Sequence, residues 1–334
     1  MNILVLAGGY SPERDVSLAS GAQVVKALRS RGHRALLLDP YKSIGPAASF
    51  PALYDTYAQD DYTHAIPAQE PDLAALKAQF GDGDALLGKH VLEACGLADV
   101  VFLALHGSYG ENGQLQATLD LHGVRYTGSD FVGCMLSMDK KIAKTLMELH
   151  GVQTPPVAAL REGNLPLVIK PPCGGSSLGV SIVRSAREME QALAYARSYE
   201  SDVLVERYIA GREFSVGVLD GRALPVIEIC PKAGWFDYAN KYQSDATAEI
   251  CPAPIPDDLA ARMQAMALKA HAALRLDSYS RVDFIVDDVG EIYCLEANSL
   301  PGMAPASLLP KEAQAAGISY EELCEKIVQL AVGA

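Results

Sequence analysis

The stretch 281–308, RVDFIVDDVGEIYCLEANSLPGMAPASL, constrains the fold of this chain more than any other. Residues 282–287 and 292–297 are apolar and rich in strand-forming types, and Asp288-Val289-Gly290 between them has the composition of a turn. The sequence therefore predicts a β-hairpin. If its turn centres on Val289-Gly290, the numbers of facing residues sum to 579, so Asp283 lies opposite Glu296.

This hairpin would bring acidic and amide oxygens together. Strand alternation puts Asn298 on the same face as Glu296. Directly opposed carboxylates repel, and burial of an uncompensated charge is costly. A hard divalent cation resolves both problems, because Mg²⁺ prefers oxygen ligands that it shares with substrate phosphates. We therefore predict a metal site at Asp283, Glu296 and Asn298; for the two acids by themselves, an exposed acidic face on an edge strand is the alternative.

Composition limits the kind of protein. The 334 residues leave room for two or three domains, and 49% hydrophobic with 21% charged residues is ordinary for a soluble globular chain. A net charge of −13 argues against a nucleic-acid partner. The seven cysteines are dispersed and never in CxxC spacing, which favours free thiols in a reducing cytosol. The chain begins directly with a strand and has no apolar run of membrane-spanning length, so we expect a cytoplasmic protein without a membrane partner.

The first third of the chain has an α/β pattern. Residues 2–7 form an apolar run that ends in two glycines, a helical pattern covers 17–31, and 34–38 is again apolar. This start is similar to that of a dinucleotide-binding domain, but the G-x-G-x-x-G pattern is absent, which disfavours a dehydrogenase. Residues 41–95 predict a loop-rich insertion with one short helix at 73–80, to which we assign no function.

A second candidate site follows the apolar run 100–105. A glycine-rich loop begins there with His106, and α/β sheets place ligands at such strand ends. His106 fits a ligand contact and a capping or packing histidine equally well.

The middle of the chain carries candidate phosphate ligands. A lysine-rich helix opens near Lys140, and the strand 165–170 ends at Lys170. The glycine-serine loop 173–179 comes next, followed by another strand, so this is not a Walker P-loop. Such loops are usually simple turns, but two lysines beside this one supply the charge that a polyphosphate needs. Further on, Glu206 lies in an apolar strand, which is an uncomfortable place for a solvated charge.

Several short segments together resemble the D-alanine–D-alanine ligases, members of the ATP-grasp superfamily. They occur in the family's order and span nearly the whole chain. The matching segments are GG (8–9), ERDVSLASG (13–21), HG (106–107), GENG (110–113), MDK (138–140), KP (170–171), GSSLG (175–179), KY (241–242), RVD (281–283), EAN (296–298), PGM (301–303) and SL (307–308).

The resemblance implies an α/β (α+β) architecture: an ATP-grasp fold preceded by a Rossmann-like preATP-grasp domain. The N-terminal domain would cover 1–128 with the insertion at 41–95, the central ATP-grasp subdomain 129–209, and the C-terminal subdomain with the metal hairpin 210–334. ATP would lie between the last two.

The resemblance also implies roles for individual residues. For the nucleotide, Lys140, Lys170, Lys241 and Ser177 surround phosphates, Glu206 and the Tyr208-Ile209 backbone meet the adenine, and Glu213 meets the ribose. Asp283, Glu296 and Asn298 would hold two Mg²⁺ ions, which Mn²⁺ replaces in some cases. For the amino acids, Glu13 accepts the first ammonium, Ser176 and Tyr242 form a latch with it, His106 lies nearby, and Ser307 and Leu308 bind the second D-alanine. We expect Arg281 and the Gly302 N–H to stabilise the oxyanion.

The activity implied is ATP- and Mg²⁺-dependent formation of D-alanyl-D-alanine through a D-alanyl phosphate, for peptidoglycan precursors, by a homodimer. D-alanine–D-serine and D-alanine–D-lactate ligation, or another ATP-grasp carboxylate–amine ligation, are the alternatives; a nucleotide sensor with a decayed site is a third. The chain departs from the family at Cys173-Gly174, at Asn112 and in the length of 41–95. None of these departures removes a group that the reaction requires.

Overall fold

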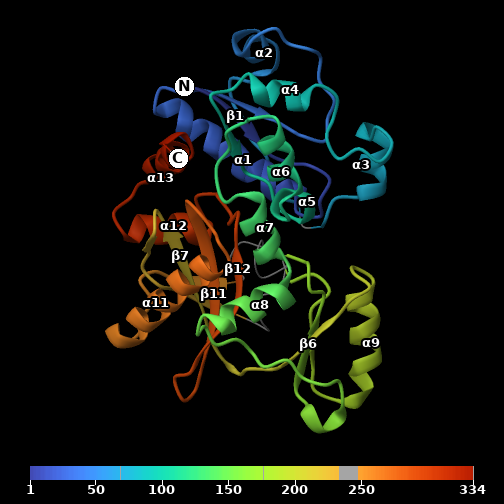
Figure 1. Cartoon of the computed structure of the whole chain (residues 1–334), viewed down its shortest axis with the longest axis vertical. Helices are drawn as coiled ribbons and strands as arrows, with labels where there is room; N and C mark the ends of the chain where they lie inside the picture. Colours follow the sequence, from blue (N-terminus) through green and yellow to red (C-terminus); the bar gives the residue numbers. More distant parts are fainter. Residues whose placement is uncertain (68, 176, 233–246, 334) are drawn as a thin grey trace.

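The computed structural model describes residues 1–67, 69–175, 177–232 and 247–333. Its elements form three groups, with the N-terminal elements at the top of Figure 1, α9 and β6 at the lower right, and α11 with β11 beside them. Helices α7 (Phe131–Met138) and α8 (Lys140–Leu149) connect the upper and lower parts. This arrangement agrees with the mixed α/β class that the sequence predicts.

The N-terminal group is built on a parallel sheet. Its strand order is β2 (Arg34–Leu38), β1 (Asn2–Leu6) and β3 (Val100–Leu103). The strands are apolar because both faces are covered, and nearly all of their side chains are buried. Helix α1 (Arg14–Ser30) packs on one face, where Gly21 allows a close approach to Ala7. The last helix, α13 (Tyr320–Gly333), returns to this core and lies beside α1 (Figure 1).

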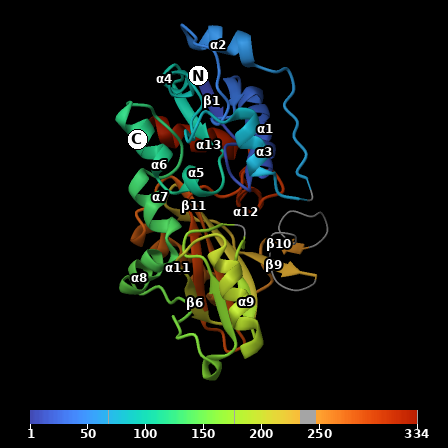
Figure 2. The ribbon, with the colours of Figure 1, turned by 90° about the vertical axis from the view of Figure 1, so that its right-hand side faces the viewer.

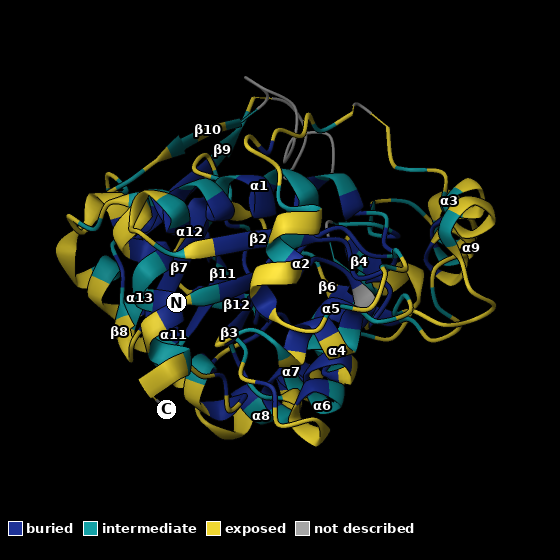
Figure 3. Cartoon of the chain, turned by 90° about the horizontal axis from the view of Figure 1, so that it is seen from above, coloured by how far each residue is buried: buried dark blue, intermediate teal, exposed yellow. Residues whose placement is uncertain are grey.

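The insertion contains more helix than the sequence predicted. The expected short helix is α3 (Leu73–Phe80), but α2 (Phe50–Tyr57) and α4 (Val91–Gly96) are also present, so the expectation of a single helix was wrong. The Pro51 that suggested a loop lies in the first turn of α2, where a missing backbone N–H costs nothing. Helix α3 buries none of its residues and lies at the edge of the molecule in Figure 3. Two further helices, α5 (Ser108–Glu111) and α6 (Gln114–Leu121), follow β3.

The central group is a small antiparallel sheet covered by one helix. Its strand order is β5 (Ser181–Val183), β4 (Leu167–Lys170) and β6 (Leu204–Arg207). Helix α9 (Ala186–Arg197) packs its small side chains against these strands, and a short 3₁₀ turn (Glu162–Asn164) precedes β4. Lys170 and Glu206 therefore lie on adjacent strands.

The C-terminal group is a larger antiparallel sheet. Its order is β10 (Thr247–Ile250), β9 (Ile227–Pro231), β7 (Gly211–Leu219), β11 (Tyr279–Asp287) and β12 (Ile292–Asn298), with β8 (Arg222–Ala223) paired to β7. Figure 2 shows β9 and β10 at its outer side. Helix α11 (Asp257–Ala273) covers the core of one face, and α12 (Leu308–Ala315) also packs on β7. No helix in the described ranges is long and apolar enough to cross a membrane.

The predicted pairing of the hairpin is confirmed, although the predicted turn was wrong. Asp283 faces Glu296, and their numbers sum to 579 as expected. Near the tip, however, Val286 pairs with Ile292, so the turn centres on Val289. A bulge between the two regions adds one residue to β12 and shifts the register back.

Candidate functional site

A pocket lies between the central sheet and the C-terminal sheet. Its apolar walls come from both sheets, and its polar rim comes from the start of α8, the loop after β4, the β6–β7 connection and the β11–β12 hairpin. Nine residues that the sequence singled out line it: Lys140, Lys170, Ser177, Glu206, Tyr208, Ile209, Glu213, Asp283 and Glu296. An apolar slot with a charged rim suits a ligand that has a flat apolar part and a charged tail.

Glu206, which lines the pocket, is buried between two lysines. The Glu206 side chain is only 2% exposed, with Lys170 Nζ 2.6 Å from Oε2 and Lys144 Nζ 2.5 Å from Oε1. Burial opposes ionisation of Glu206, but the two lysines outweigh it and lower the pKa of the carboxyl. The sequence analysis missed Lys144, although its position four residues after Lys140 puts both on one helix face.

Lys140 connects the glycine-serine loop to the hairpin. Its Nζ donates to the Gly174 carbonyl at 2.5 Å and lies 3.1 Å from Glu296 Oε2. Burial favours the neutral amine, but Glu296 outweighs it, so the pKa of Lys140 is raised. Lys140 is therefore a fixed positive charge at the phosphate end that the sequence predicted.

The predicted metal-binding trio, Asp283, Glu296 and Asn298, comes together as the strand register requires. Asp283 accepts hydrogen bonds from Ser215 Oγ at 2.9 Å and from Asn298 Nδ2 at 3.1 Å, and Arg281 makes a two-pronged pair with it at 2.9 and 2.7 Å. Burial lowers the pKa of Arg281, but Asp283 outweighs that effect and raises it. Ser215 is a neighbour that the sequence analysis did not identify.

The donor set of the trio fits a hard cation. The described residues contain no cluster of three or more His, Cys, Asp or Glu side chains suited to a metal. Asp283 and Glu296 instead face each other at the pocket rim, and the Asn298 amide lies beside Asp283; substrate phosphates complete such oxygen sets in typical Mg²⁺ sites.

Glu13 lies where two loops meet. It is 7% exposed at the start of α1. A Cβ added at Gly107, after β3, would lie 3.3 Å from Glu13 Oε2, and one added at Gly175, in the glycine-serine loop, would lie 3.1 Å from it. Glu13 thus connects the N-terminal sheet to the loop that borders the pocket.

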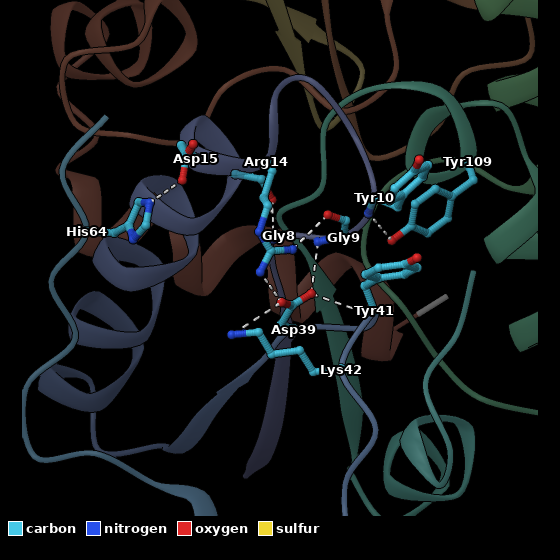
Figure 4. Close-up of polar contacts among 11 residues, drawn as sticks. Gly8, Gly9, Tyr10, Arg14, Asp15, Asp39, Tyr41, Lys42, His64 and Tyr109 are labelled. Carbon is cyan, nitrogen blue, oxygen red and sulfur yellow. Dashed lines mark hydrogen bonds and ion pairs between the residues drawn. The ribbon is translucent and has the colours of Figure 1, made fainter. Parts of the chain in front are cut away.

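The loop that carries Glu13 is held by a buried ion pair (Figure 4). Arg14 pairs with Asp39 at the end of β2 and donates to the Gly9 carbonyl at 2.7 Å. Asp39 Oδ1 also accepts from the Gly9 and Tyr41 amides at 3.0 and 3.1 Å. These bonds fix the backbone on both sides of Glu13.

His106 and Glu111 line the same corner. Burial lowers the pKa of His106, and its Nε2 has no hydrogen-bond partner in the described part of the chain. Glu111 accepts from the Gly107 amide at 2.6 Å; burial and the nearby Glu13 raise its pKa to about 8. The structure therefore leaves both interpretations of His106 open.

The remaining predicted residues follow β12. A Cβ added at Gly302 would lie 2.9 Å from Ser307 Oγ, so these two residues come together at the start of α12. Leu308 is 5% exposed and packs against Ile227 and Ile229. Ser176, Lys241 and Tyr242 lie outside the described residues.

Comparison with known proteins finds one family over nearly the whole chain. Residues 2–129 match the family model described as D-ala D-ala ligase N-terminus, and residues 149–329 match D-ala D-ala ligase C-terminus. The D-alanine--D-alanine ligase of Pediococcus pentosaceus is 42% identical over 98% of this chain and 97% of its own. That of Lacticaseibacillus casei is 37% identical over 98% and 95%. Among solved structures, D-alanine--D-alanine ligase from Bacillus anthracis complexed with ATP has a TM-score of 0.75 at 30% identity, covering 100% of this chain and 98% of that one.

Proposed function

This chain belongs to the D-alanine–D-alanine ligase family, and from that membership we propose that it joins two D-alanines at the expense of ATP. The product would be D-alanyl-D-alanine, a peptidoglycan precursor. The observation that carries the proposal is the convergence of two lysines, a buried glutamate and two facing carboxylates on one pocket, with Glu13 at its edge.

The nucleotide would occupy the pocket with its base toward Glu206 and its phosphates toward Lys140 and Lys170. The buried Glu206 carboxylate would accept a hydrogen bond from the adenine amino group, and the half-buried Tyr208-Ile209 backbone borders the same end of the pocket. Glu213 would bind the ribose hydroxyls, and Ser177 would contribute to the phosphate cover together with Lys241. Two lysines balance the phosphate charge that repels an incoming carboxylate.

Asp283, Glu296 and Asn298 would hold magnesium beside the phosphates. When bound, the metal neutralises charge on the transferred phosphoryl group. The support is the pair of facing carboxylates on the pocket rim, with the Asn298 amide beside Asp283.

The first D-alanine would be held by Glu13, which accepts its ammonium group. Its carboxylate oxygen attacks the γ-phosphorus of ATP, and ADP leaves. This phosphorylation is required because a carboxylate oxygen is too poor a leaving group for an amine to displace. Glu13 suits this task, since a fixed backbone and two adjacent loops hold it. Ser176 and Tyr242, which lie outside the described residues, would complete the latch.

The second D-alanine would place its carboxylate at Ser307, at the start of α12. Its neutral amine attacks the acyl carbon to give a tetrahedral oxyanion and then loses a proton to solvent; as the oxyanion collapses, the C–O bond breaks and phosphate leaves with the electron pair. Arg281 and the Gly302 N–H would donate to that oxyanion; loss of one such donor costs about 3 kcal/mol of barrier. No covalent bond to the protein forms, so Ser176 orients and is not a nucleophile.

The test is substrate-dependent phosphate release. Purified protein with ATP, Mg²⁺ and D-alanine alone should release phosphate and ADP in equal amounts. Release only after D-lactate or D-serine is added would reassign the second substrate. Glu296→Gln should abolish turnover, whereas a nucleotide sensor would keep its nucleotide-dependent response.

We also propose a cytoplasmic homodimer. All seven cysteines are free, as expected where thiols stay reduced. Exposed apolar side chains on α7 and α8 support self-association: Phe131 is 42% exposed, Met135 47% and Ile142 43%. Light scattering after gel filtration should give a dimer, and Met135→Lys should shift it toward the monomer; a wild-type monomer at micromolar concentration would contradict the proposal.

A further inference from the structure

Glu206 has two cationic partners that differ in their access to the pocket. Lys170, on the neighbouring strand β4, lies on the pocket wall. Lys144, on α8, contacts Glu206 from outside the pocket. It is 3% exposed and is not among the described residues that line the pocket. The two lysines therefore have different environments, although both contact the same carboxylate.

Three features hold Lys144 in place: a capped helix, the Pro155 carbonyl and Glu206. Asp139 caps α8 by accepting from the Lys141 and Ile142 amides at 2.9 and 3.2 Å, so the helix that carries Lys144 has a defined start. The Lys144 Nζ also donates to the Pro155 carbonyl at 2.5 Å, and Pro155 itself lines the pocket. The ammonium group thus connects the helix, the pocket wall and Glu206.

We propose that Lys144 is a positioning residue for nucleotide selection: it keeps Glu206 ionised, as an acceptor for the adenine amino group, when Lys170 turns to the phosphates. This inference rests on the proposed function for the roles of Glu206 and Lys170. A lysine on the pocket wall has to leave Glu206 at least in part to meet a phosphate. Without a second cation, a carboxylate that is 2% exposed would then take up a proton.

Protonation would change what Glu206 can recognise. An ionised carboxylate only accepts hydrogen bonds, whereas the neutral acid carries a donor on one oxygen. A 6-amino group offers hydrogens to an acceptor, so the neutral acid matches it less well. Lys144 would therefore act through Glu206 and affect the base, while the phosphates remain with Lys140 and Lys170.

Two nucleotides isolate this effect. Purine riboside triphosphate differs from ATP only in lacking the 6-amino group, so the ratio of its Kd to that of ATP measures recognition of that group. We would measure both constants by calorimetry with Mg²⁺ and without D-alanine, for the wild type, K144M, E206Q, K144M/E206Q and the control K141M. The Lys141 Nζ pairs with the exposed Asp202 at 2.6 Å, so K141M removes an ion pair from the same helix away from Glu206.

We expect K144M to lower the ratio at least tenfold by weakening ATP binding, with K141M unchanged. In the E206Q background, K144M should leave the ratio where E206Q alone puts it. The inference is overturned if K144M weakens both nucleotides by the same factor, or if it lowers the ratio of E206Q further. If K144M fails to fold, the double variant K144M/E206Q, which lacks both charges of the pair, has to fold and to give the same Kd ratio as E206Q. Any other result overturns the inference. A wild type that prefers ATP but releases no phosphate with D-alanine would refute the proposed function and leave this inference standing.

Discussion

Replacement of Asp39 by Asn tests how the loop that carries Glu13 is held. The side chains of Arg14 and Asp39 are 6% and 7% exposed, so this ion pair is shielded from solvent. An Asn side chain has nearly the same shape and still accepts from the Gly9 and Tyr41 amides, which now bond to Asp39. The substitution therefore removes the charge and, because the new Nδ2 replaces the oxygen that accepts from Arg14, the hydrogen bond of the ion pair.

The expected cost follows from this burial. Removal of one partner from a buried pair leaves the other charge uncompensated and costs about 3–5 kcal/mol. Exposed pairs contribute about 1 kcal/mol or less. The matched control is Lys26→Met on the same helix, because Lys26 and its partner Asp61 are 40% and 68% exposed. Since domains are stable by only about 5–15 kcal/mol, D39N should be visibly destabilised and K26M should not.

Activity should follow the same order. A backbone shift of about 1 Å at a substrate-positioning group can lower a rate about a hundredfold. We expect D39N to reduce kcat/KM for D-alanine about ten- to hundredfold and to leave the Kd of ATP unchanged, because the nucleotide pocket is built from other elements.

The assay is a double-mutant cycle by urea unfolding with D39N, R14M and R14M/D39N, followed by circular dichroism. The double variant should lose less than the sum of the two single losses, because neither charge remains alone. If the two losses simply add, or if D39N costs no more than K26M, the pair does not hold the loop and the reasoning fails.

Three further predictions concern the site and its support. E296Q should abolish phosphate release from ATP with D-alanine while the protein melts normally; turnover within tenfold of the wild type would argue against a role for this carboxylate. Burial raises the pKa of Glu111 to about 8 from 4.5, so between these values the unfolded chain has lost a proton that the folded chain keeps, and wild-type stability falls as the pH rises. E111Q should therefore gain stability relative to the wild type from pH 4.5 to 8 in urea titrations, and a constant difference would refute the assignment. G21A should lower stability by about 1–3 kcal/mol in thermal unfolding, because the added Cβ would lie 2.4 Å from Ala7 Cβ; a neutral result would mean that α1 moves freely over the sheet.

In the hairpin, the residue pattern predicts the facing pair correctly but predicts neither the turn centre nor the bulge. Alternation along each strand depends only on local geometry, so the amino-acid pattern is enough to place Asp283 opposite Glu296. The pairing is correct although the turn centre was wrong, because a bulge in β12 adds back the residue that the turn removes. A bulge depends on packing against the neighbouring strand and leaves no alternation signal of its own.

The sequence pattern did not predict helices α2 and α4 of the insertion, for a related reason. Helix α2 begins at Phe50 with a proline in its first turn, and proline reads as a loop signal in sequence although it is well tolerated there.

The sequence by itself determined the strands and helices outside the insertion and most of the charged groups of the pocket, because hydrophobic periodicity and short motifs depend on neighbours along the chain. Tertiary structure alone decided which distant charges meet: Lys140 with Glu296, and Lys144 and Lys170 with Glu206. It also decided that α13 returns to pack beside α1 in the N-terminal core. The physical reason is that an ion pair gains its strength from burial, and burial is a property of segments that come together only after folding.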